Sequence, residues 1–143
     1  MSSLSEILTT PEKAPAAVTT LSGVVQDEVQ SKSGIGGMAL KAGFAAATKI
    51  RPDLVPHAVE RMLPDFAEKL DPYWQGRGAQ PFGEHLRAHE AQVTDALLAV
   101  TDERVEHARP AIGKIYSGLR PKAAAHVRDA LPRLGAAIES LAD

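Results

Sequence analysis

The pattern of apolar and polar residues is helical along almost the whole chain. Apolar residues recur at spacings of three and four, and no stretch shows the strict alternation of a strand. In residues 16–31 these positions form one helix face, made by Val18, Leu21, Val25 and Val29. Lys32 and Gly34 follow as a basic last turn and a glycine suited to the end of a helix. We therefore expect a helix over residues 16–31.

A second helix is predicted over residues 35–50, which offer little polar surface. Gly36, Gly37 and Gly43 each cost about 1 kcal/mol in a helix interior relative to alanine. Close approach of a neighbouring helix would offset this cost, because a glycine lets two backbones come near each other. We therefore expect this helix at the centre of the bundle.

Prolines interrupt the next helical segment, residues 54–75. Proline lacks the backbone N–H and favours the first turn of a helix over its interior. Pro56, Pro64 and Pro72 therefore predict kinked or consecutive short helices, with each proline near a first turn.

A loop divides the chain near its middle. Residues 76–83 contain three glycines and a proline, the strongest loop signal in the sequence. Tyr73 and Trp74 precede this loop, and we expect them to close the core rather than to bind a ligand. The sequence thus allows two halves, residues 1–75 and 84–143, joined by the loop.

Further helices are predicted after the loop. They cover residues 84–100 and 103–119, with residues 101–102 as a turn or cap and a break at Arg120 and Pro121. The last helix has a regular apolar stripe, formed by Val127, Leu131, Leu134, Ile138 and Leu141.

These patterns together predict an all-α protein, a compact bundle of about five to seven helices with several broken or kinked at prolines. The length suits one domain of residues 1–143. The apolar-Arg-Pro motif occurs at both 50–52 and 119–121, and each copy precedes a histidine at the same distance. This echo fits a duplication of the two halves, and it also fits chance.

Composition excludes several kinds of site. The chain has 16 basic and 18 acidic residues and no cysteine, so it forms neither a disulfide nor a cysteine-ligated metal centre. Aromatic residues make up 4%, too few for a platform that stacks single-stranded nucleic acid. We expect no cofactor and no transmembrane segment, because a span needs about 20 mostly apolar residues. Residues 1–13 lack a targeting pattern, so we expect a cytoplasmic protein.

Several segments resemble a family of small all-helical actinobacterial proteins. They are SLSEIL at 3–8, SKSGIGGMALKAGF at 31–44, MLPDFAEKLDPYW at 62–74, ALLAVTDER at 96–104, IYSGLRPKAAAHV at 115–127 and ALPRLG at 130–135. That family is known only as a domain of unknown function. The resemblance spans nearly the whole chain and implies one all-helical cytosolic domain from an actinobacterium. It attaches no catalytic or binding role to any residue.

Basic residues gather in two stretches without an acid, residues 32–51 and 109–128. If the stretches meet in space, they form a patch that attracts nucleic acid, an anionic membrane surface or an acidic partner. If they scatter around the helices, they are an ordinary solvated surface. The candidate anion-binding residues are Lys32, Lys41, Lys49, Arg51, Arg109, Lys114, Arg120, Lys122 and Arg128.

Two histidines form a candidate metal site. His85 and His89 stand four residues apart, so on one helix both imidazoles project from the same face. Glu84 and Glu90 stand nearby, but the order HExxH of zinc proteases is absent. A third ligand would have to come from elsewhere in the chain, for example His107 or Asp95. The alternative is a polar helix face with two solvated histidines.

The chain shows no motif for nucleophilic catalysis or nucleotide binding. Residues 33–37 are rich in glycine, but they match neither phosphate-binding loop pattern. The leading hypothesis is a non-enzymatic cytosolic protein that acts through protein–protein contacts, with another protein or with itself as a homodimer. The alternative is an anion-binding module on the two basic stretches, and a metal-dependent enzyme at His85 and His89 is less favoured.

Overall fold

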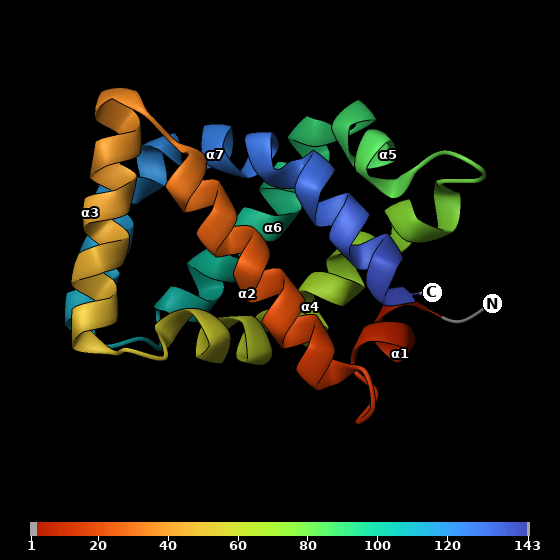
Figure 1. Cartoon of the computed structure of the whole chain (residues 1–143), viewed down its shortest axis with the longest axis horizontal. Helices are drawn as coiled ribbons and strands as arrows, with labels where there is room; N and C mark the ends of the chain where they lie inside the picture. The colour runs from red at the N-terminus through yellow and green to blue at the C-terminus, as the bar shows by residue number, and fades with distance from the viewer. Residues whose placement is uncertain (1–2, 143) are drawn as a thin grey trace.

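The computed structural model describes residues 3–142, and every regular element in that range is an α-helix (Figure 1). The expected all-α bundle of five to seven helices is confirmed. Residues 1, 2 and 143 of the expected domain lie outside the described residues. The helices are α1 (Leu4–Leu8), α2 (Ala14–Ser31), α3 (Gly34–Ile50), α4 (Leu54–Gly76), α5 (Phe82–Ala88), α6 (Glu90–Val105) and α7 (Pro110–Ala142).

Four prolines lie inside helices, and this corrects two expectations. Pro64 and Pro72 lie within a continuous α4, and Pro121 lies within α7 where a break was predicted, as does Pro132 further along. All four prolines are exposed, and so are the residues four positions before them. Water therefore reaches the carbonyl groups that lose their helical partner, which lowers the cost of each proline. Figure 1 shows α7 passing behind α3 and then changing direction toward the C-terminus.

The hydrophobic core lies between α1, α2, α4, α5, α6 and the C-terminal half of α7. Trp74 is buried there and meets the Phe82 ring edge to face, with ring centroids 5.0 Å apart. This contact confirms that Trp74 closes the core beside the loop at residues 77–81. The largest fully buried side chains are Phe82, Leu4, Leu8, Leu86, Leu131, Ile138 and Val93.

Helix α3 stands at the edge of the bundle, and its expected central position is wrong (Figure 1). It packs mainly against α7, with smaller contacts to α2 and α4. Ile35 is 86% exposed and Met38 is 70% exposed. The close approach predicted for its glycines is confirmed at Gly43, where a Cβ atom would lie 2.8 Å from the Leu119 side chain.

The tightest helix crossing joins α5 to α7 at Gly83 and Gly135. A Cβ atom on Gly135 would lie 2.3 Å from the Gly83 backbone. This crossing could not be predicted from the sequence, because the two glycines are far apart in the chain and each lies in an ordinary helical pattern.

The helix expected over residues 84–100 ends at His89. His89 has φ −119° and ψ 31°, so α5 stops before it and α6 starts after it. The expected turn at residues 101–102 is absent, because α6 continues to Val105. Among the seven helices described, none is long and apolar enough to cross a membrane.

Candidate functional site

An apolar cavity of about 340 Å³, partly open to solvent, lies between α1, α2, α3, α4, α6 and α7. Its size falls within the range of small-molecule sites, about 300 to 1,000 Å³. Most of its lining residues are aliphatic or aromatic, and the polar ones are Glu28, Lys32, Thr101, Tyr116 and His126. Its size and its apolar lining therefore make the cavity a candidate site for a small molecule.

Helix α3 supplies one wall of this cavity through Leu40 and Phe44. Gly43, on the same helix, packs against Leu119 and Ile115 of α7 and so brings α3 down onto α7. Small residues elsewhere in the lining leave the space open, because Ala67, Ala123 and Ala130 stand where larger side chains would fill it.

One polar group in the lining lies where α2 ends beside α7. Lys32 Nζ lies 2.9 Å from Asp129 and 3.4 Å from Glu28, and Arg133 lies 3.1 Å from the other Glu28 oxygen. Lys32 and Glu28 are mostly buried, with side chains 13% and 14% exposed. Two cations thus face two carboxylates, and the group has no net charge. The hydrogen bond from Lys32 holds the pKa of Asp129 below its usual range.

His126 lies in the same part of the lining and is half-buried. Burial lowers the pKa of its imidazole, and the positive charge of Lys32 lowers it further. His126 is therefore neutral at pH 7. Within residues 3–142 the imidazole forms no hydrogen bond and no ion pair, so it presents an unpaired donor and an unpaired acceptor.

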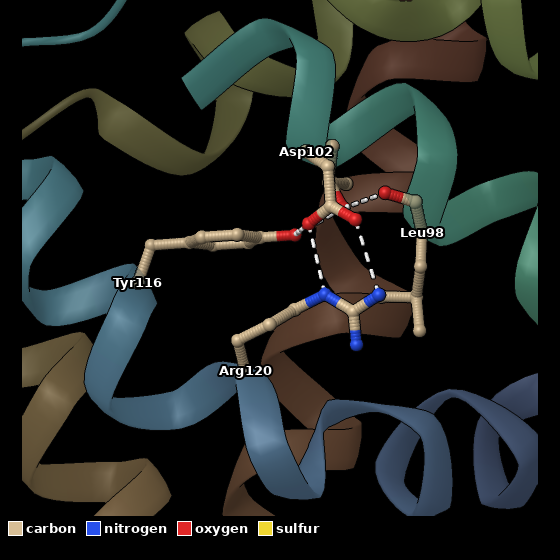
Figure 2. A network of polar contacts seen from close by, with 5 residues as sticks. Leu98, Asp102, Tyr116 and Arg120 are labelled. Carbon is tan, nitrogen blue, oxygen red and sulfur yellow. Dashed lines mark hydrogen bonds and ion pairs between the residues drawn. The ribbon is translucent and has the colours of Figure 1, made fainter. Parts of the chain in front are cut away.

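The second polar group joins α6 to α7 and is shown in Figure 2. The Tyr116 hydroxyl donates to Asp102 at 2.5 Å, and Arg120 donates to both Asp102 oxygens at 2.8 and 3.1 Å. Thr101 donates to the carbonyl oxygen of Leu98 at 3.0 Å and lies 2.7 Å from the Tyr116 hydroxyl. The Tyr116 hydroxyl, both Asp102 carboxylate oxygens and two of the three Arg120 guanidinium nitrogens thus have partners within the protein (Figure 2).

These bonds set the ionisation of the network. The hydrogen bonds from Arg120 and then Tyr116 hold the pKa of Asp102 below its usual range. Burial raises the pKa of Tyr116, and its bond to the Asp102 carboxylate adds to the shift. A charged carboxylate and a neutral phenol make a structural link between helices rather than a nucleophile with its base.

The structure brings the two basic stretches together, because α3 packs along the N-terminal half of α7. Three of the nine candidate anion-binding residues are already neutralised: Lys32 by Glu28 and Asp129, Arg51 by Asp53, and Arg120 by Asp102. In the part of the chain that the structure describes, the other six form no ion pair, namely Lys41, Lys49, Arg109, Lys114, Lys122 and Arg128.

His85, on α5, and His89, the residue between α5 and α6, come close together even though the helix ends between them. Their ring centroids are 4.8 Å apart, and His85 Nδ1 lies 3.0 Å from the Gln80 side-chain oxygen. No group of three metal-ligating side chains occurs in residues 3–142, and His107 and Asp95 do not complete a site there. Two imidazoles without a third ligand leave the metal site a prediction.

The cavity and the Asp102 network were both missed by sequence reasoning. A carboxylate at residue 102 resembled a solvated cap, whereas it binds Tyr116 and Arg120 from another helix. The available signal was the four-residue spacing of Tyr116 and Arg120, which places both on one helix face. Their partner depends on how α6 and α7 pack, and periodicity does not record that.

A family model described as "Family of unknown function (DUF6918)" matches residues 4–142. The chain belongs to this family, as the sequence motifs indicated. No curated protein and no solved structure matches the chain.

Proposed function

We propose, for this member of a family without an assigned function, that the protein binds an apolar small molecule in the cavity beneath α3. One observation carries the proposal, a space of about 340 Å³ walled by aliphatic and aromatic side chains. An engineered apolar cavity of about 150 Å³ already binds benzene. The role is non-enzymatic, since the polar groups at the cavity are paired with one another or, at His126, lack a nucleophile to activate.

Helix α3 supports this proposal as a cover for the cavity. It contributes Leu40 and Phe44 to the lining, and it has few neighbours other than α7. An element with few buried contacts opens at lower free-energy cost than the core does. An outward movement of α3 would therefore widen the opening of the cavity and leave the core around Leu131 and Ile138 intact.

The direct test is a titration with N-phenyl-1-naphthylamine, an uncharged dye that fluoresces in apolar surroundings. Ala123 lines the cavity on α7, whereas Ala125 lies on the exposed side of the same helix. Ala123→Phe should fill part of the cavity and weaken dye binding at least tenfold, and Ala125→Phe should leave it unchanged. Wild-type protein that does not bind the dye, or Ala123→Phe that binds it equally well, would reject the proposal.

Self-association is a second candidate, favoured by the outer face of α3, which we define by Ile35, Met38, Ala42 and Lys49. This face is exposed and mostly apolar. Two copies meeting there would bury Ile35 and Met38 but bring like charges together. The dimer fraction in light scattering should therefore rise with salt and fall in Ile35→Asp. A monomer at every salt and protein concentration would remove this candidate, and binding to a different protein would remain.

Anion binding by the two basic stretches stays a proposal of lower rank, because three of its nine residues are paired with carboxylates. Cytoplasmic location is likewise proposed. The absence of cysteine fits a reducing compartment, and fractionation of the producing cells tests it.

A further inference from the structure

The polar residues that line the cavity differ in whether they have partners. The hydroxyl groups of Thr101 and Tyr116 lie 2.7 Å apart, and they donate to the carbonyl oxygen of Leu98 and to Asp102, respectively. A ligand group placed there would have to displace a bond that the protein already makes. A ligand would therefore gain little net hydrogen-bond energy at Thr101 and Tyr116.

Charged residues of the lining are also occupied. Lys32 contacts Glu28 and Asp129, and Arg133 contacts Glu28. A ligand that displaced these contacts would leave the mostly buried side chains of Lys32 and Glu28 without a counter-charge, which is unfavourable. These contacts hold the C-terminal end of α2 against the C-terminal half of α7.

His126 is the exception. It lines the cavity, and it lacks a hydrogen-bond partner in the described part of the chain. An imidazole can donate through one ring nitrogen and accept through the other, so it suits both hydroxyl and carboxyl groups. Two positive charges, Lys32 and Lys122, and two negative charges, Asp129 and Glu28, act on its imidazole, so the site does not demand a charged ligand.

We infer that the cavity takes an amphiphile, an apolar chain or ring system that ends in a single hydroxyl or carboxyl group, and that His126 binds this polar end. This inference rests on the proposed function. The aliphatic walls would hold the apolar part, and His126 would fix which end of the ligand lies between α2 and α7. His126 is a binding and orienting residue here, without any chemical step.

The test compares three ligands of equal chain length, decane, 1-decanol and decanoic acid, each displacing N-phenyl-1-naphthylamine from wild type and His126→Leu. A hydrogen bond of ordinary strength changes affinity about three- to tenfold. His126→Leu should therefore weaken 1-decanol, decanoic acid or both by about that factor and leave decane unchanged. The two polar arms show whether the head is a hydroxyl or a carboxyl group.

Two further variants keep the result clear. His126→Gln retains a donor and an acceptor and should restore at least part of the lost affinity, and His107→Leu changes an exposed histidine and should have no effect. Equal losses for decane and for the polar ligands in His126→Leu would overturn the role of His126 while leaving an apolar site. Failure of all three ligands to displace the dye would overturn the ligand class, and failure of the dye itself to bind would overturn the proposed function as well.

Discussion

Alanine and glycine residues line both the cavity of this protein and its closest helix contact. Alanines 67, 123 and 130 face the cavity and leave it open. Gly83 and Gly135 do the opposite, because they let two backbones meet without a side chain between them. A residue without bulk thus has opposite effects, depending on whether a neighbouring helix moves in to use the space.

His126 gives a residue-scale prediction about pH. Its folded-state pKa lies below the unfolded value of about 6.5, so the unfolded chain binds the proton more readily. The stability linked to this residue is full above the unfolded pKa and is lost as pH falls through the folded pKa. His126→Leu should therefore lose less stability than wild type between pH 7 and pH 5 in urea unfolding.

Exposed His107 provides the control, since His107→Leu should keep the wild-type slope. His85 retains its own lowered pKa in both variants, so the slope should shrink without vanishing. A slope in His126→Leu equal to that of wild type would contradict the account of this imidazole.

Tyr116 gives a second prediction at this scale. Its hydroxyl binds Asp102, which is also held by Arg120. Tyr116→Phe removes one hydrogen bond from a half-exposed network and should lower the free energy of unfolding by about 1 kcal/mol. Chemical denaturation measures the change. Ser117→Ala, an exposed neighbour on α7, serves as the control, and equal stability of the two variants would show that the bond contributes nothing.

At the scale of helices, periodicity predicted α2 and α3 to within two residues of their observed ends. It failed at prolines, because a proline signals a break only when its lost backbone bond cannot be replaced. Pro64 and Pro121 point to water, so α4 and α7 continue through them. The predicted central position of α3 was also wrong. Its glycines indicate close contact with one neighbouring helix, and they do not indicate how many helices surround α3.

The α5–α7 crossing yields the sharpest prediction at this scale. Gly135→Ala would place a methyl group against the Gly83 backbone, which cannot move aside as a side chain can. We expect a loss of about 2 kcal/mol or more in unfolding free energy. Gly118→Ala lies in the same helix with open space around it, and it should stabilise by up to about 1 kcal/mol. A loss of stability in Gly135→Ala together with a gain in Gly118→Ala would confirm the crossing. A Gly135→Ala variant as stable as wild type would contradict it.

At the scale of the whole molecule, the net charge of −2 conceals an uneven distribution of basic and acidic residues. The two basic stretches lie side by side on α3 and α7, with six cations left unpaired by the described residues. The composition and the spacing of these residues could be read from the sequence. Their neutralising partners could not, because Asp102 and Asp129 reach them only through tertiary packing.

Retention on heparin tests this surface. Wild-type protein should bind the heparin column at low salt and elute at a low salt concentration, because a few exposed lysines attract the polyanion only weakly. Lys114→Glu should elute earlier than wild type, whereas Lys69→Glu, on α4 outside both stretches, should have a smaller effect. Free passage of wild type at low salt would reject the anion-binding alternative.

The cavity could not be predicted from the sequence, because apolar positions predict which residues are buried and do not predict unfilled space. The most direct measurement is the crystal structure under xenon pressure, since xenon enters dry apolar cavities. We expect xenon density between Leu40 and Phe44 of α3 and Ala123 of α7, at the site of about 340 Å³. A structure in which side chains fill this space and xenon does not bind would contradict it.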